Sequence, residues 1–209
     1  MALKRMVIDG YGQLELNQVA FPRDGRIEAQ CALYKEDFAL DREVNTDKIY
    51  AECGMLLVVD NITRRIKLPS AENVKIFPVA LNYSTEHMYD ERDGFSLRNF
   101  YLPRGRELPR MGYLSAQDKF TTNCICYDDG EFTSEEALME ALDNIADTPL
   151  YGGVAVPAGE ADKAAAGAIK LSATKPTTGP VLLVTKKTTM PDGQLGVKLH
   201  CIGMAGIAD

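Results

Sequence analysis

The sequence has few of the features that mark catalytic, nucleotide-binding or membrane proteins. Its 209 residues include only two histidines, His87 and His200. The glycines occur singly or as the pair Gly152-Gly153, without the lysine and strand-to-helix turn of a phosphate-binding loop. No serine lies in a Gly-x-Ser-x-Gly turn, which disfavours a hydrolase of that class. The residues therefore predict no catalytic group and no cofactor.

Positive charge is also scarce, because 23 lysines and arginines face 30 acidic residues and the net charge is −7. A dedicated nucleic-acid binder needs a surplus of basic residues on at least one face, so this class is disfavoured. No run approaches the roughly 20 apolar residues of a membrane span, and the first residues lack an apolar signal region. We expect a protein made in the cytoplasm, with neither nucleic acid nor membrane as a partner.

Five cysteines are an odd number in a chain large enough to be stable without bridges, so we expect reduced thiols. Cys124 and Cys126 are two residues apart, which is unlike the spacing of a zinc knuckle. A site of His87 with Glu86 and Asp90 can be drawn, but exposed polar decoration of a loop explains these residues equally well. The sequence thus predicts no metal.

The segment 73–128 holds most of the aromatic residues and several apolar runs, so we expect it to form the core. Strands are predicted at 74–83, 100–102, 111–114 and 119–127, with a turn at 90–94. Pro78 cannot donate to a ladder, so the first strand should be bulged or lie at an edge. The last strand should place four side chains on one face, namely Phe120, Thr122, Cys124 and Cys126.

Three hairpins are predicted around turn residues. The first joins 14–21 to 26–33 through Pro22-Arg23-Asp24-Gly25, and the second joins 55–59 to 62–68. The third joins 181–190 to 194–202 through Pro191-Asp192-Gly193, and its side chains alternate between apolar and polar.

One main helix is expected at about 133–146, because Thr133 and Glu136 have capping-box spacing ahead of an apolar stripe that ends before Pro149. The alanine-rich stretch 150–168 is expected to be a loop or short helix at the surface. The predicted fold class is α+β, mostly β, with antiparallel hairpins forming a sheet, sandwich or small barrel. We expect an N-terminal arm with β-hairpins at 1–70 and a main β-rich domain at 71–209.

Two segments are candidates for binding a partner. Arg104, Arg106 and Arg110 lie in a loop punctuated by proline and glycine, and could pair with carboxylates of another protein or with carboxylates of this chain. The segment 1–16 is too short and polar to pack alone and could gain order from a partner. Its candidate contact residues are Leu3, Val7, Tyr11 and Leu14.

Three stretches resemble virion structural proteins of tailed bacteriophages, and the head decoration (cement) proteins are the most similar group. They are 1–17 (MALKRMVIDGYGQLELN), 118–123 (DKFTTN) and 190–198 (MPDGQLGVK). The resemblance implies a non-enzymatic protein that binds the major capsid protein on the outside of the assembled capsid and stabilises it. It would be made in the host cytoplasm, reside on the capsid surface of the virion and form a homo-oligomer, for which we prefer a trimer. The alternatives are a tail- or fibre-associated adaptor and, third, an enzyme with an unrecognised site.

Overall fold

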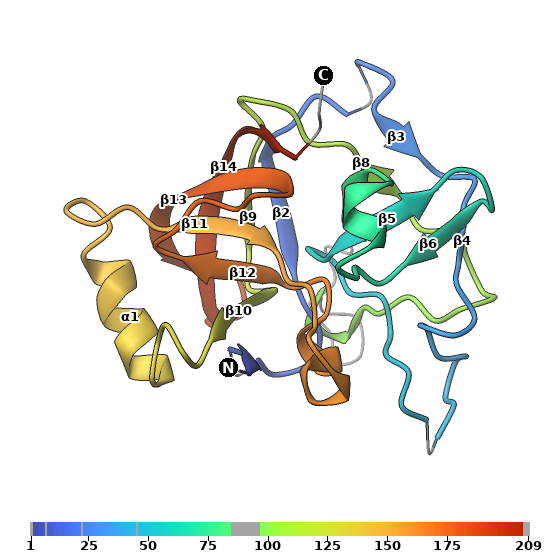
Figure 1. Ribbon diagram of the computed structural model, residues 1–209, viewed down its shortest axis with the longest axis horizontal. Helices are drawn as coiled ribbons and strands as arrows, with labels where there is room; N and C mark the ends of the chain where they lie inside the picture. Colours follow the sequence, from blue (N-terminus) through green and yellow to red (C-terminus); the bar gives the residue numbers. More distant parts are fainter. Residues whose placement is uncertain (1, 7, 22, 45, 85–96, 207–209) are drawn as a thin grey trace.

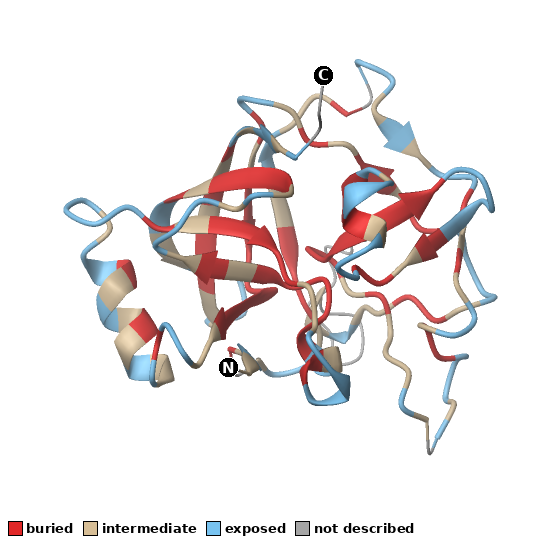
Figure 2. Ribbon diagram, in the orientation of Figure 1, coloured by how far each residue is buried: buried red, intermediate tan, exposed pale blue. Residues whose placement is uncertain are grey.

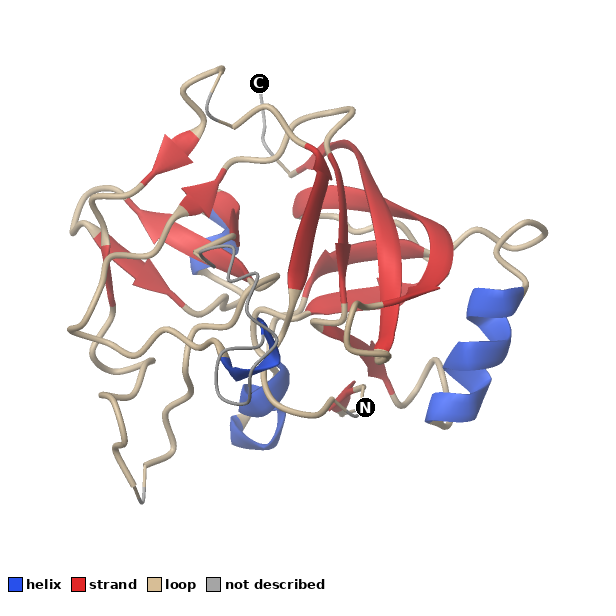
Figure 3. Cartoon of the chain, turned by 180° about the vertical axis from the view of Figure 1, so that it is seen from behind, coloured by secondary structure: helices blue, strands red, loops and turns tan. Residues whose placement is uncertain are grey.

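The computed structural model describes residues 2–6, 8–21, 23–44, 46–84 and 97–206. Its strands form two open sheets that lie side by side along the longest axis of the molecule (Figure 1). Seen from behind, the long α-helix lies at the far end of the larger sheet (Figure 3). The predicted fold class, α+β and mostly β with one main helix, is confirmed.

The larger sheet has eight described strands, of which β10 and β12 pair in parallel and the other neighbours pair antiparallel. Their spatial order is β1 (Leu3–Arg5), β10 (Ile125–Asp128), β12 (Ile169–Ser172), β11 (Tyr151–Val154), β13 (Gly179–Thr189), β14 (Leu195–Ala205), β9 (Lys119–Thr122) and β2 (Leu14–Gln18).

The smaller sheet has six strands, with β4 and β6 as its parallel pair. Their order is β3 (Ile27–Glu28), β8 (Met111–Gly112), β7 (Val79–Asn82), β5 (Leu56–Asp60), β6 (Arg65–Lys67) and β4 (Ala32–Leu33). Each sheet contains strands from both sides of residue 70, so the predicted domain boundary passes between paired strands in both.

Strand β5 joins the two cores of the molecule, because all five of its residues are buried. Leu56 and Val58 face one apolar cluster, which also fills the larger sheet. Leu57 and Val59 face a second cluster, which includes Cys124 and several alanines. Figure 2 shows the buried residues concentrated on the strands and the exposed ones on the loops. A strand buried on both faces carries a continuous apolar run, as β5 does.

Two of the predicted hairpins are confirmed. β5 pairs antiparallel with β6, and β13 pairs antiparallel with β14. In β14, the side chains of Val197, Leu199 and Cys201 are buried and those of Lys198 and His200 are half-exposed. All five cysteines are free and buried.

The first predicted hairpin is wrong, because β2 pairs with β9 and β3 pairs with β8 in the other sheet. Phe21 is fully buried, and Arg26 donates two hydrogen bonds to Asp118 at 2.7 and 3.2 Å. Phe21 and Arg26 thus anchor the chain where it crosses from β2 of the larger sheet to β3 of the smaller one. The local turn signal could not reveal that each arm has a more distant partner.

The strand predicted at 74–83 is only partly present. Its first residues form the 3-10 helix η1 (Asn73–Lys75), and β7 begins after Pro78. The Asn73 amide side chain accepts a hydrogen bond from the Ser70 backbone N–H at 2.8 Å and donates one to the Leu68 carbonyl at 2.9 Å. These local side-chain-to-backbone hydrogen bonds compete with a strand and override the alternating pattern. The predicted turn at 90–94 lies outside the described residues.

The strand predicted at 119–127 is divided into β9 and β10 at Asn123, whose side chain accepts a hydrogen bond from the Gln13 N–H at 2.6 Å. The break changes which face the following residues occupy. Phe120 therefore packs in the first core cluster, whereas Cys124 and Cys126 pack in the second. The predicted common face is wrong. Of the other runs, 111–114 supplies β8, and Leu102 forms only an isolated bridge with Ala51.

The main helix, α1 (Glu135–Asp143), begins after Ser134, one residue beyond the predicted cap. The Ser134 hydroxyl accepts the hydrogen bond of the Ala137 N–H at 3.3 Å. The short helix predicted within the stretch 150–168 is present, but the stretch is not a surface connection throughout. It supplies β11 and the 3-10 helix η3 (Glu160–Ala165), and its small residues Ala165, Ala166 and Ala168 are buried.

A largely buried ion pair ties the two sheets together. The Arg5 guanidinium of β1 lies 3.0 Å from the carboxylate of Glu52, in the loop that leads into β5, and both side chains are about 15% exposed. The same carboxylate accepts the Gly12 N–H at 2.7 Å, and Arg5 also donates to the Ala164 carbonyl at 3.4 Å. Each charge thus has a partner within the interior.

We expect Glu52→Gln to lower the free energy of unfolding by about 3 kcal/mol or more, because Arg5 would then be buried without a counter-charge. Chemical denaturation measures this change. The control is Asp9→Asn, which breaks the exposed ion pair between Arg98 and Asp9 at 2.7 Å. Exposed pairs contribute little, so the control should differ only slightly from the wild type. Equal effects of the two substitutions would contradict the role given to Glu52.

The C-terminal hairpin depends on glycine in its loop. Gly193 has a φ of +89° and no atom within 4 Å of an added Cβ. We expect Gly193→Val to destabilise the protein by about 1–2 kcal/mol through backbone conformation alone. Gly159→Val is the matched control, because Gly159 has equal space but an extended φ of −169°. Thermal unfolding compares them, and equal midpoints would refute the assigned geometry.

Candidate partner-binding site

Three tyrosines from separate loops form a half-exposed cluster, the tyrosine cluster. The ring centroid of Tyr101 lies 4.7 Å from that of Tyr11 and 4.5 Å from that of Tyr50, and the other pair is 6.2 Å apart. Paired backbone bonds between Ala51 and Leu102, at 3.1 and 2.9 Å, place Tyr50 beside Tyr101. The cluster is therefore held by main-chain contacts rather than by the rings alone.

Tyr11 reaches the cluster through a tight turn. Its backbone N–H donates to the Arg98 carbonyl at 2.7 Å. The preceding Gly10 has a φ of +88°, and a Cβ there would collide with the same carbonyl. Only glycine permits this approach at low cost.

A carboxylate links the tyrosine cluster to the arginine loop. The Tyr101 hydroxyl donates to Asp41 at 2.8 Å, and the Arg106 guanidinium lies 3.8 Å from the other oxygen of Asp41. The side chain of Arg106 is 65% exposed, and Leu40 beside Asp41 is 44% exposed. We call the tyrosine cluster together with Leu40, Asp41 and Arg106 the Tyr–Arg surface.

Two tyrosines of this surface, Tyr11 and Tyr101, have raised pKa values and are neutral at physiological pH. The hydrogen bond to Asp41 raises the pKa of Tyr101, and partial burial adds to the effect. Burial raises the pKa of Tyr11, with smaller contributions from Tyr50 and Glu52. Neutral hydroxyls on apolar rings suit contacts that combine packing with hydrogen bonding.

The structure brings some of the predicted partner residues together and separates others. Tyr11 and Arg106 belong to the same surface, and Arg104 lies beneath it, with its Nε donating to the Phe38 carbonyl at 3.2 Å. Arg110 is half-buried and donates to the Ser84 carbonyl at 3.3 Å.

The remaining predicted residues lie elsewhere. Leu3 is in β1 and packs against the second core cluster, and Leu14 is 7% exposed within the first. Val7 lies outside the described residues. Sequence reasoning missed Tyr50, Tyr101 and Asp41, and the available signal was the occurrence of tyrosine in otherwise polar segments.

Two cavities are lined by charged groups that pair within the chain. The first, of about 500 Å³, is bordered by Arg26 and Asp118, which bind each other. The second, of about 430 Å³, contains Lys67, which lies 2.6 Å from Asp60, and Lys163, which lies 3.1 Å from Asp47.

Across the described ranges, no group of three or more His, Cys, Asp or Glu residues is placed to hold a metal ion. No described helix is long and apolar enough to cross a membrane.

Comparisons with protein-family models, with curated proteins and with solved structures found no match to this chain.

The tyrosine hydroxyls predict a pH dependence. A pKa that is raised in the folded state stabilises the protein fully below the ordinary tyrosine pKa of about 10, and this stability is lost as pH rises through the folded value. We expect the wild type to be more stable than Tyr101→Phe at about pH 8, and the difference to shrink above about pH 10. Chemical denaturation across this range measures it. A difference that is independent of pH would contradict the Asp41 contact.

Proposed function

We propose that this protein is a non-enzymatic virion structural protein that binds the major capsid protein on the outside of the assembled capsid and stabilises it. The observation that carries the proposal is the Tyr–Arg surface. Tyrosine and arginine are enriched among the residues that contribute most to protein–protein binding. The resemblance of three sequence stretches to head decoration proteins selects the capsid as the partner.

The geometry of the surface supports a binding role. Its tyrosines are already packed against one another, and its loops are joined by the bridge between Ala51 and Leu102 and by the bridge between Leu40 and Arg104. Preorganised loops lose little conformational entropy when a partner binds. The exposed Leu40 and Arg106 then supply apolar contact and a charge for a carboxylate.

Self-association is part of the proposal. The Tyr–Arg surface consists of few residues, so a single chain would bind the shell with limited affinity. A symmetric oligomer lets several such contacts act together on a symmetric shell. We propose a homo-oligomer, with a trimer preferred. It is made in the host cytoplasm and resides on the capsid surface of the virion.

The same surface would also suit a tail or fibre protein, and purification separates the two cases. A decoration protein should co-purify with heads that lack tails, whereas an adaptor should co-purify with tails only. An enzyme with an unrecognised site would bind a small ligand in the absence of either.

We expect heads saturated with the wild-type protein to withstand heating better than bare heads, because a ligand of the assembled shell stabilises it by mass action. Arg106→Glu should weaken binding about tenfold or more, since removal of a central interface residue commonly costs over about 1 kcal/mol. Lys186→Glu is the matched control, because Lys186 is exposed on β13 and has no ion pair with a described residue. Co-sedimentation and thermal release measure these effects.

Heads prepared without this chain would overturn the proposal if they were as heat-resistant as complete ones and did not bind the purified protein. If heads bound Arg106→Glu and the wild type equally, the Tyr–Arg surface would be excluded as the contact.

A further inference from the structure

The turn between β5 and β6 projects an unusual group of side chains into solvent. Ile62 at its tip is 83% exposed, and the neighbouring Arg64 and Arg65 are exposed too. Neither arginine forms an ion pair with a described residue. An exposed branched apolar side chain beside two arginines that have no ion-pair partner among the described residues is suited to an acidic protein surface with an apolar centre.

This turn is rigid. Asp60 is 2% exposed, and its carboxylate accepts hydrogen bonds from the Ile62 and Thr63 N–H groups at 3.0 Å and from the Thr63 hydroxyl at 2.7 Å. Lys67 lies 2.6 Å from the same carboxylate. Burial alone would raise the pKa of Asp60, but these bonds outweigh burial and hold it well below its usual range. These bonds hold the backbone of the tip against the buried Asp60 carboxylate.

Arg64 has a φ of +52°, a backbone conformation that favours glycine or asparagine. Its carbonyl accepts the Ala32 N–H at 3.2 Å, so the surrounding strands hold the residue in place. The backbone of Arg64 is thus fixed where its side chain projects into solvent.

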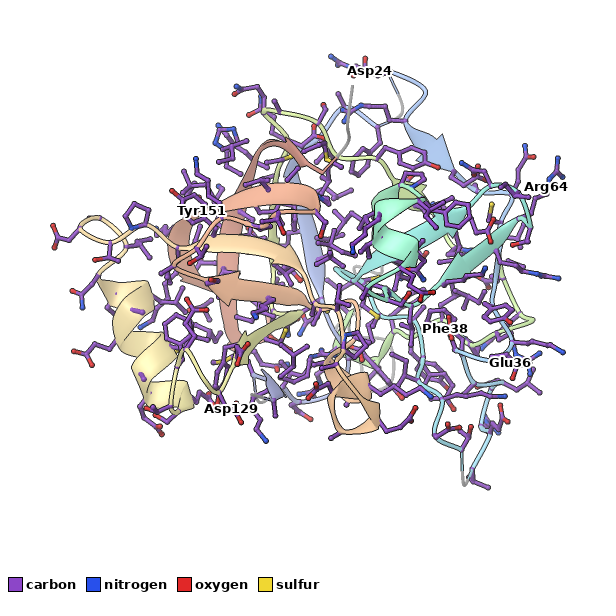
Figure 4. The ribbon with its side chains drawn as sticks, in the orientation of Figure 1. Asp24, Glu36, Phe38, Arg64, Asp129 and Tyr151 are labelled. Atoms are coloured by element: carbon purple, nitrogen blue, oxygen red, sulfur yellow. The ribbon has the colours of Figure 1, made fainter. Side chains whose placement is uncertain are left out.

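The matching surface lies at the other end of the molecule. The segment 128–147, which contains α1, has eight acidic residues and no basic one, while all 23 basic residues and 22 of the 30 acidic ones lie elsewhere. Arg64 and α1 occupy opposite ends of the longest axis (Figures 1 and 4). Charge is thus separated along the molecule.

The acidic side of α1, in which we include Asp147 of the turn that follows the helix, is only partly paired with described residues. Glu140 and Asp147 are exposed and form no ion pair with a described residue. Asp143 has a partner, Lys187, at 2.6 Å. The last turn of α1 contains no basic residue, and acidic groups near a helix C-terminus oppose the helix dipole. A cationic group from another molecule would neutralise these carboxylates and offset their unfavourable interaction with the helix dipole. The half-exposed Met139 offers an apolar contact beside these carboxylates.

We propose that the β5–β6 turn of one copy, through Ile62, Arg64 and Arg65, docks on the acidic side of α1 of a second copy. Because the two surfaces lie at opposite ends, each copy can use both at once. Such a head-to-tail contact builds a ring if the rotation between copies closes and a chain if it does not. The inference rests on the self-association included in the proposed function and names its surfaces.

A charge exchange tests the contact in purified protein. The turn variant carries Arg64→Glu and Arg65→Glu, and the helix variant carries Glu140→Lys and Asp147→Lys. The matched control, Lys75→Glu with Lys186→Glu, changes the net charge as the turn variant does at exposed lysines outside both surfaces. Sedimentation velocity measures association from about 1 to about 200 µM, at about 50 mM and about 500 mM salt.

We expect the wild type and the control to associate, and high salt to weaken both. Each charge-reversed variant alone should associate at least about tenfold more weakly, because like charges then meet at the contact. An equimolar mixture of the two variants should regain association, since each turn then meets a helix of opposite charge. A purely structural role for these residues would not produce this rescue.

Absence of self-association in the wild type, or failure of the mixture to regain it, would overturn the proposal. Loss of head binding by the turn variant with unchanged self-association would assign the turn to the capsid protein and reject the second copy as its partner. Because association is measured without heads, failure of this inference is distinguishable from failure of capsid binding.

Discussion

The buried ion pair between Arg5 and Glu52 is the contact on which both the fold and the candidate site depend. It joins β1 of the larger sheet to the loop that leads into β5 of the smaller one. The Glu52 carboxylate also fixes the Gly12 N–H, and Gly12 follows Tyr11 directly in the chain. Tyr50 lies two residues before Glu52 on the other side of the site. The interaction that aligns the sheets thus sets the positions of two of the three clustered tyrosines.

Close backbone approach makes this junction possible. A Cβ at Gly12 would lie 2.7 Å from the Cys53 carbonyl oxygen, and one at Gly54 would lie 2.9 Å from the Cys124 Cβ. Contacts this short are not tolerated, so larger residues would push the sheets apart. Burial raises the pKa of Cys124 to about 12, so this thiol packs as a neutral apolar group. The neutral thiol thus packs beside the Arg5–Glu52 ion pair as an apolar group.

The exposed features are distributed over different parts of this rigid body. The Tyr–Arg surface is formed by loops that the ion pair and the Ala51–Leu102 bridge hold in place. The β5–β6 turn and α1 lie at the two ends of the longest axis. A chain that binds a shell through one surface and its own copies through two others can cover a lattice without blocking its main contact.

The sequence by itself determined the elements whose signal is local. These are the β-rich class, the hairpins predicted at 55–68 and 181–202, and a capped helix within one residue of its start. Turn glycines, alternation and capping residues act over a few positions, so they are visible without coordinates. Tertiary structure decided the partners of β2 and β3, the break at Asn123 and the burial of the alanines near 165, because each depends on contacts distant in sequence. It also assembled Tyr11, Asp41, Tyr50 and Tyr101 from separate loops. No periodicity connects such residues, since their proximity follows from how two sheets pack against each other.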